Sequence, residues 1–174
     1  MQPIPRGPLN GRRPTVAIEQ VISGGQTGVD RAALEVAEEL GLGSGGWCPA
    51  GRLAEDGTIP EHYPLRETPT SEYEERTEWN VRDSDGTLIL TIGQPSGGTA
   101  HTIECAQAAA KPYFVLDLDA EAGAHVVREW LERNRIRTLN VAGPRESKAP
   151  GIEQRAARYL LELLAADLPR EARE

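Results

Sequence analysis

Two glycine-rich segments carry the groups best suited to binding an anion. The first reads SGGQTG from Ser23 to Gly28, and the second reads PSGGT from Pro95 to Thr99. Glycine lets the backbone approach a ligand closely, and the amide groups at the start of a helix favour a negative charge. We therefore expect both segments to bind phosphate. The residues expected to contact it are Gly24, Gly25, Gln26, Thr27, Gly28, Ser96, Gly97, Gly98 and Thr99.

Charged side chains could add to such a site. Asp30 and Arg31 fall in the first helical turn after the first segment. Asp30 suits either a helix cap or a bond to a ligand hydroxyl, and the residue type does not decide between them. Arg76 offers a planar cation that suits phosphate, but composition alone favours a solvated Arg in its Glu-rich stretch. Other candidates are Arg31 or Arg52 for charge and Trp47 or Trp79 for stacking on a ring.

Glu104 lies one to two turns into the helix that follows the second glycine segment. A carboxylate close to a phosphate could act on a sugar or a base, and an ordinary solvated Glu is an equally good interpretation. The cysteines and histidines show no metal-binding spacing such as CxxC or HExxH. We therefore expect no site for a bare metal ion. The cysteines and histidines without such spacing are Cys48, Cys105, His62, His101 and His125.

The two glycine segments each follow a predicted strand and precede a predicted helix. Strands are expected over 15–23, 45–49, 86–92, 112–118 and 137–142, and helices over 29–40, 71–82, 99–110, 121–134 and 152–168. Alternating strands and helices indicate an α/β fold, a Rossmann-like parallel sheet with helices on both faces. Ligands bind at the carboxyl ends of such strands. That rule brings together the loops 24–28, 93–98 and 143–150.

Length and composition limit the class of protein. The chain has 174 residues, which suits one domain over 15–168 between a loose arm (1–14) and a tail (169–174). A net charge of -8 argues against a nucleic-acid-binding face. Two widely spaced cysteines and no long apolar run indicate a cytoplasmic protein without disulfides or a membrane segment.

The motifs resemble those of the Rossmann-like superfamily that includes the cytokinin-activating phosphoribohydrolases, once called lysine decarboxylases. The order Glu75-Arg76-Thr77, Ser84-Asp85 and Pro95–Thr99 matches that pattern. A branch known as molybdenum (molybdenum-cofactor) carrier proteins is more similar still. The segments that carry this likeness are Ser23–Arg31, Gly46–Arg52 with Ala54–Gly57, Arg76–Val81 and Gly97–Thr99.

The resemblance implies a cytoplasmic homo-oligomer, a dimer or tetramer, that holds a phosphorylated pterin such as molybdenum cofactor, or a nucleotide-like ligand. It also implies ligand contacts for Arg76 and Asn80. The alternative function is a nucleoside 5′-monophosphate phosphoribohydrolase with Arg76 and Glu104 as catalytic residues. The PGGxGTxxE motif of those enzymes is broken here, since Glu104 follows Thr99 by five residues instead of three. The broken motif favours a carrier or sensor.

Overall fold

The computed structural model describes residues 17–120 and 122–165, and the predicted arm 1–14 and tail 169–174 lie outside them. A five-stranded sheet in the order β2-β1-β9-β7-β8 forms its centre, and every pair in it is parallel. This confirms the predicted Rossmann-like sheet. Its strands are β1 (Gln20–Ile22), β2 (Gly43–Gly45), β7 (Gly86–Thr91), β8 (Tyr113–Asp117) and β9 (Thr138–Ala142).

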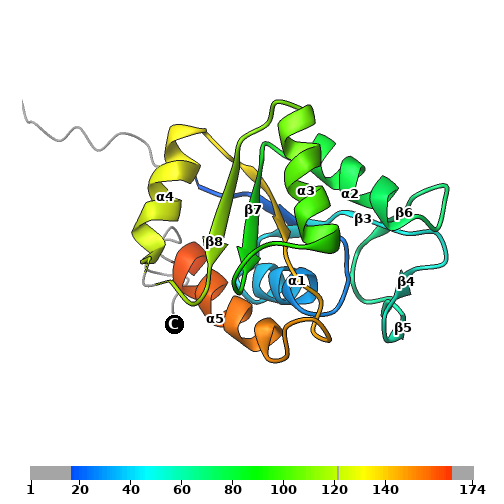
Figure 1. Cartoon of the computed structure of the whole chain (residues 1–174). Helices are drawn as coiled ribbons and strands as arrows, with labels where there is room; N and C mark the ends of the chain where they lie inside the picture. The colour runs from blue at the N-terminus through cyan, green and yellow to red at the C-terminus, as the bar shows by residue number, and fades with distance from the viewer. Residues whose placement is uncertain (1–16, 121, 166–174) are drawn as a thin grey trace, which may run out of the picture.

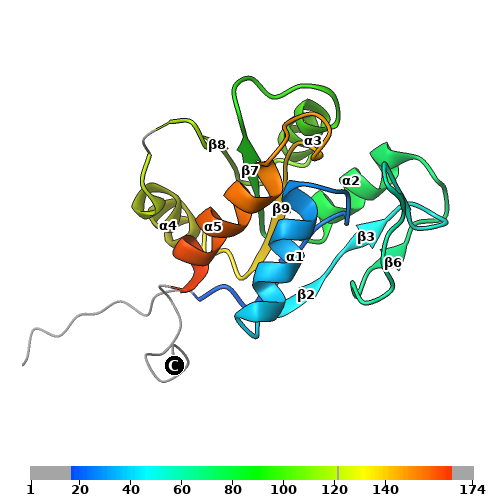
Figure 2. The same ribbon diagram turned by 90° about the horizontal axis from the view of Figure 1, so that it is seen from below.

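Helices cover both faces of the sheet, as the sequence predicted (Figures 1 and 2). On one face, α5 packs against both α1 and α4, and on the other face α2 packs against α3. The helices are α1 (Val29–Glu39), α2 (Tyr73–Arg82), α3 (Gly97–Ala108), α4 (Ala124–Arg133) and α5 (Ile152–Ala165). None of them, within the described residues, has the length and apolar character needed to cross a bilayer.

The strand β7 explains why the sheet is covered on both sides. All six of its residues are buried, and both side-chain faces of its GTLILT sequence are apolar or β-branched apart from the glycine, as expected for an interior parallel strand. Leu88 and Leu90 join Val141 of β9 in the main core. The strand therefore fixes the position of the second glycine segment, which follows it.

The region between α1 and α2 differs from the prediction. The single strand expected over 45–49 is split at Gly46, whose φ of 128° turns the chain away from the sheet. A side chain at this position would overlap the Ser23 carbonyl. The expected loop 50–60 also holds a short hairpin. The small strands are β3 (Trp47–Cys48), β4 (Leu53–Ala54), β5 (Gly57–Thr58) and β6 (Arg66–Glu67).

A second, smaller core holds this region against α1. Leu34 of α1 packs there with Cys48, Ile59, Tyr63 and Leu65. The side chain of Arg52 donates hydrogen bonds to the main-chain carbonyls of Ile59, Pro60, Tyr63 and Leu65. Arg52, a candidate ligand cation by sequence, therefore stabilises this loop through its hydrogen bonds.

Candidate functional site

A cavity of about 420 Å³ opens where β1, β7 and β9 end. Its walls come from the loops that follow these strands and from one side of α2. The convergence of three loops predicted from strand order is therefore present. Nine of the residues predicted to bind a ligand line the cavity: Gly24, Gln26, Asp30, Arg76, Asn80, Ser96, Gly97, Gly98 and Thr99.

The start of α3 forms an open wall of this cavity. Ser96 has no side-chain hydrogen bond that caps the helix, and no acidic residue occupies the first turn. A Cβ atom on Gly97 or Gly98 would meet nothing within 4 Å, so the space in front of this turn is empty. Gly97 has a φ of 54°, which favours glycine. The helix dipole and an uncovered first turn together favour an anion here.

The charge of the lining is opposite to that of the whole chain. Three cations, Arg76, Arg145 and Lys148, face the cavity. Asp30 is the one carboxylate among the described residues that line it. A chain with a net charge of -8 thus concentrates positive charge at this opening, which attracts an anionic ligand.

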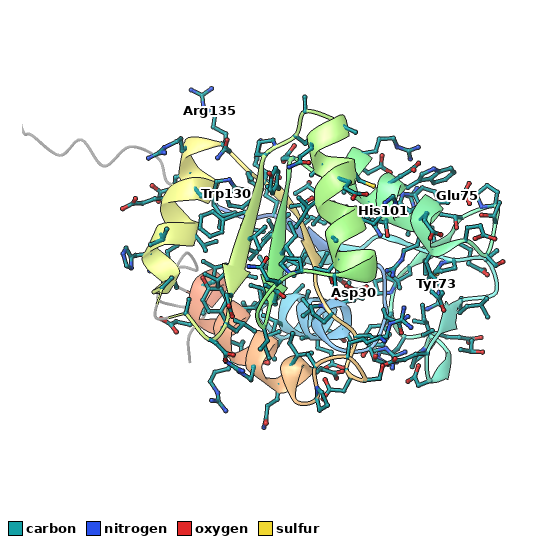
Figure 3. All side chains as sticks on the ribbon, in the orientation of Figure 1. Asp30, Tyr73, Glu75, His101, Trp130 and Arg135 are labelled. Atoms are coloured by element: carbon teal, nitrogen blue, oxygen red, sulfur yellow. The ribbon has the colours of Figure 1, made fainter. Side chains whose placement is uncertain are left out.

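Arg76 is held in place by an acidic partner and by an aromatic ring. Its Nη1 donates to Asp30 Oδ2 at 2.9 Å, and the two side chains are 14% and 6% exposed. Its guanidinium carbon lies 5.7 Å from the ring centre of Tyr73, and that of Arg145 lies at the same distance from this ring. Figure 3 labels Asp30 and Tyr73 near the starts of α1 and α2. The ring therefore lies close to two of the cavity's cations.

Gln26 contributes a buried donor to the cavity. The residue is 5% exposed. Its Oε1 accepts hydrogen bonds from the amides of Thr27 at 3.1 Å and Glu55 at 3.0 Å. Its Nε2 has no partner among the described residues, and neither does Nε of Arg76. Buried donors are nearly always paired, so these two unpaired nitrogens are exceptions among the described residues of the cavity wall.

The first glycine segment does not present its amides as expected. Gln26 N donates to Asp30 Oδ2 at 3.2 Å, Gly28 N to Glu153 Oε2 at 3.1 Å, and Val29 N to the Pro144 carbonyl at 3.3 Å. Two carboxylates therefore already accept hydrogen bonds from the amides at the start of α1. Gly25, Thr27 and Gly28 are not among the residues that line the cavity. Their expected phosphate contacts are not supported by this geometry.

Thr27 and Gly25 contact other parts of the protein and not the cavity. Thr27 Oγ1 donates to Glu55 and accepts from the amide of Glu146 at 3.1 Å. A side chain on Gly25 would overlap Leu65 of the small core. The first loop therefore ties the hairpin region to the loop that follows β9.

Arg31 was a candidate for ligand charge, but the structure pairs it elsewhere. Its two terminal nitrogens donate to Asp56 at 2.6 and 2.8 Å, and its Nε donates to the Gly25 carbonyl at 3.1 Å. The hydrogen bonds from Arg31 hold the pKa of Asp56 below its usual value, and the same bonds raise the pKa of Arg31. This ion pair fixes the β4–β5 hairpin against α1.

Asn80 lines the cavity, but its amide is already occupied. Oδ1 accepts from Trp47 N at 2.8 Å, and Nδ2 donates to Trp47 O at 2.9 Å. The indole of Trp47 packs edge-on against Trp79 at 4.6 Å between ring centres, and neither ring lines the cavity. Asn80 therefore joins α2 to β3, and the two tryptophans are not placed to stack on a ligand there.

Glu104 is separated from the cavity that contains Arg76. Its side chain is 73% exposed, and Oε2 lies 3.5 Å from Nδ1 of His101. It lines a second hollow, between α2 and α3, where Arg76 is absent from the described lining. The helical register explains this, because a residue seven positions after Gly97 is nearly two turns further along the helix. The structure does not bring the two expected catalytic residues together.

Some lining residues were not singled out from the sequence. Arg145 and Lys148 belong to the loop 143–150, which strand order placed at the site without identifying its cations as ligands. Asn140 lies in the middle of β9 and is buried. The sequence did contain a signal for Lys148. The whole chain has two lysines, and one of them lies in a loop that strand order places at the ligand-binding edge of the sheet. The other polar side chains missed are Thr77, Thr91, Gln94 and Thr102.

Comparison with known proteins connects this geometry to a family. Residues 21–164 match the family model described as "Circularly permutated YpsA SLOG family". The chain is similar to the crystal structure of a protein from Syntrophus aciditrophicus SB, solved at 1.45 Å and named "Putative molybdenum carrier protein". The two share 47% identity over 85% of this chain and 96% of that one, with a TM-score of 0.83. No curated protein matches the chain.

These matches confirm the likeness to molybdenum carrier proteins that the glycine segments and the motif around Arg76 indicated. The family match spans the sheet and all three loops of the cavity. On this basis the chain belongs to the circularly permutated YpsA SLOG family.

Proposed function

We propose that this protein binds and carries a small phosphate-bearing molecule, a phosphorylated pterin such as molybdenum cofactor or a nucleotide-like compound. The observation that carries the proposal is the uncapped start of α3 beside the cations of one cavity. Gly97 and Gly98 would contact the phosphate, and Lys148 and Arg145 would balance its charge. The name of the similar protein supports a carrier role in general terms.

The rest of the cavity suits a polar ring system. Gln26 Nε2 and Arg76 Nε are buried donors without partners among the described residues. Asn140 donates from Nδ2 to Thr87 Oγ1 at 3.2 Å, which leaves its carbonyl available to a ligand donor. Pterins and purines carry both acceptors and donors along their edges. A volume of about 420 Å³ is in the range of small-molecule sites.

Retention of the ligand is favoured over its hydrolysis. Cleavage of an N-glycosidic bond needs a carboxylate near the anomeric carbon or its attacking water. Glu104 lies outside the cavity, and Asp30 is bound to Arg76 and to the amide of Gln26. No other carboxylate belongs to the described lining. The cavity therefore lacks, among its described residues, the free carboxylate that the phosphoribohydrolase alternative requires.

Calorimetric titration with pyrophosphate tests the anion site. Wild-type protein should bind one equivalent, and binding should weaken as salt is added, because exposed charges are screened. Gly98→Asp should abolish binding, because it adds a carboxylate at the start of α3. Lys148→Ala should weaken binding about tenfold, as expected for the loss of one charge-assisted contact worth roughly 1.4 kcal/mol.

Arg158→Ala is the matched control, since Arg158 is an exposed cation on α5 that does not line the cavity. It should bind pyrophosphate like wild type. Equal affinity in wild type and Gly98→Asp would contradict the proposed phosphate site. As a separate test, native mass spectrometry of protein purified without oxygen would identify the co-purified molecule. A co-purified ligand without phosphate would contradict the proposed class of ligand.

A further inference from the structure

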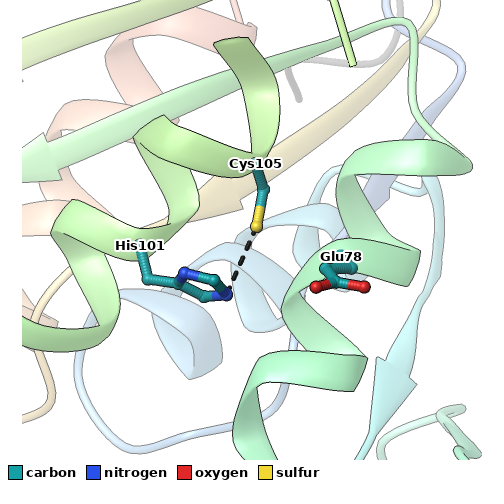
Figure 4. Close-up of side chains that lie close together, drawn as sticks. All are labelled: Glu78, His101 and Cys105. Carbon is teal, nitrogen blue, oxygen red and sulfur yellow. Dashed lines mark hydrogen bonds between the residues drawn. The ribbon is translucent and has the colours of Figure 1, made fainter. Parts of the chain in front are cut away.

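A second cluster of reactive side chains lies between α2 and α3, away from the cavity described above. Glu78 of α2 faces His101 and Cys105 of α3, as Figure 4 shows. One potential ligand atom from each lies within 4.8 Å of the others. His101 and Cys105 are four residues apart, so helical periodicity places them on one face.

The distances suit a tetrahedral metal ion. His101 Nε2 lies 3.4 Å from Cys105 Sγ. Zinc bonds of about 2.0 Å to nitrogen and about 2.3 Å to sulfur place two tetrahedral ligands roughly 3.5 Å apart. Glu78 is exposed, so its carboxylate has the freedom to complete the set without moving the backbone.

Glu104 has a natural role in this arrangement. A metal-binding histidine usually donates its other ring nitrogen to a carboxylate, which orients the ring and raises its basicity. Glu104 Oε2 lies 3.5 Å from Nδ1 of His101, on the side of the ring away from Cys105. The residue that the sequence suggested as catalytic is thus positioned to orient His101.

We propose that Glu78, His101 and Cys105 form a binding site for zinc or a similar borderline-soft divalent cation, oriented by Glu104. A nitrogen, sulfur and oxygen set suits zinc and disfavours magnesium and calcium, which prefer oxygen alone. Three protein ligands leave one coordination position for water. The hollow at the cluster is open to solvent, which gives the ion a path of entry.

The proposal differs from what the sequence predicted. The site has neither CxxC nor HExxH spacing, because its histidine and its cysteine are a single pair one helical turn apart. The third ligand comes from another helix, and the packing of α2 against α3 brings it into reach. Burial raises the pKa of the Cys105 thiol, and Glu78 and Glu104 raise it further. A divalent cation would reverse that effect, because it stabilises the thiolate.

Titration with cobalt(II) and zinc(II) tests the site directly. Wild-type protein should bind one equivalent of cobalt with an absorption band from thiolate-to-metal charge transfer and the strong visible bands of tetrahedral cobalt. Cys105→Ser should lose the charge-transfer band. Competition with a chromophoric chelator should show at least about a hundredfold weaker zinc binding in Cys105→Ser and His101→Asn, and about tenfold weaker binding in Glu104→Gln.

Matched controls separate this site from other thiols, imidazoles and carboxylates. Cys48→Ser, His125→Asn and Glu74→Gln each remove the same chemical group elsewhere, and should keep wild-type zinc affinity. Circular dichroism of each metal-free variant verifies its fold, and His101→Asn serves if Cys105→Ser does not fold. Zinc should raise the melting temperature of wild type and leave that of His101→Asn unchanged. Equal zinc affinity in wild type and His101→Asn, or a cobalt spectrum without charge transfer, would overturn the proposal.

Discussion

The guanidinium of Arg76 lies directly over the main chain of Gly24, at the place where any other residue would carry its Cβ atom. A Cβ built there would overlap Arg76 Nη1, and would lie 2.7 Å from Cζ and 3.0 Å from Asp30 Oδ2. Gly24 is therefore needed because a side chain at this position would occupy the space of Arg76. A glycine after β1 and an arginine on α2 form one unit of the cavity wall.

Gly24→Ala should displace Arg76 from Asp30 while keeping the fold. The atoms that a methyl group would meet belong mainly to the end of a long side chain, which can swing away. We expect a modest loss of stability, about 1–2 kcal/mol, together with at least tenfold weaker binding of pyrophosphate or nucleotide. Urea unfolding and calorimetry measure the two effects.

Gly45→Ala controls for the loss of a buried glycine close to the same sheet edge. Its Cβ would be 3.5 Å from Gln20 Nε2 and 3.6 Å from the Pro64 carbonyl, which are ordinary contacts. This variant should keep wild-type affinity. If Gly24→Ala bound as well as Gly45→Ala, then Arg76 would not contribute to the ligand site.

Strand order and glycine loops predicted much of this site because they follow from general rules of parallel sheets. The three loops meet as those rules require, and Arg76 lies among them. The choice between the two helix starts could not be predicted. The start of α1 is covered because Glu153 of α5 reaches Gly28 N, and that contact depends on how two helices pack far apart in the sequence.

Side-chain partners were the least predictable feature. Arg31 and Asn80 have the residue types of ligand contacts, but Asp56 and the main chain of Trp47 occupy their polar groups. Both partners lie in the region from 46 to 60, where the sequence predicted one short strand and a loop. The split at Gly46 and the hairpin place them against α1 and α2, and no periodicity in the sequence indicates that arrangement.

Asp30→Asn should move stability and anion affinity in opposite directions. The substitution leaves the Arg76 cation without its counter-charge, in a cavity wall where both side chains are mostly buried. We therefore expect the free energy of unfolding to fall by about 3 kcal/mol. The cavity also loses its one carboxylate among the described lining residues, so pyrophosphate should bind several-fold more tightly.

The double variant Asp30→Asn/Arg76→Met completes the test, because it removes both charges. It should recover part of the lost free energy of unfolding. It should bind pyrophosphate more weakly than Asp30→Asn, because it lacks the cation, and more tightly than Arg76→Met, because it lacks the carboxylate. A double variant whose stability loss equals the sum of the two single losses would show that the pair is not coupled.

The Arg31–Asp56 pair predicts a defined dependence of stability on pH. The pKa of Asp56 is lower in the folded protein than in the unfolded chain, so its contribution is complete above the unfolded value of about 3.9 and is lost as the pH falls through the folded value. Asp56 is half exposed, so the contribution is less than about 1 kcal/mol. Asp56→Asn should flatten the acid side of the stability curve.

Chemical unfolding between pH 3 and pH 7 measures this effect. Glu74→Gln, an exposed carboxylate on α2, is the control and should keep the slope of the wild type. If the curves of Asp56→Asn and wild type ran parallel down to pH 3, the ion pair would not stabilise the hairpin against α1.

The separation of Arg76 from Glu104 predicts that nucleotides are held and not cleaved. Incubation with AMP should release no adenine above the rate without protein, as followed by chromatography. Glu104→Gln should leave AMP affinity unchanged, because its carboxylate lies on the other hollow, whereas Arg76→Gln should weaken AMP binding. Adenine release that is lost in Glu104→Gln would instead require α3 to rotate or a second copy of the chain to supply the carboxylate. That result would restore the hydrolase as the function of this cavity.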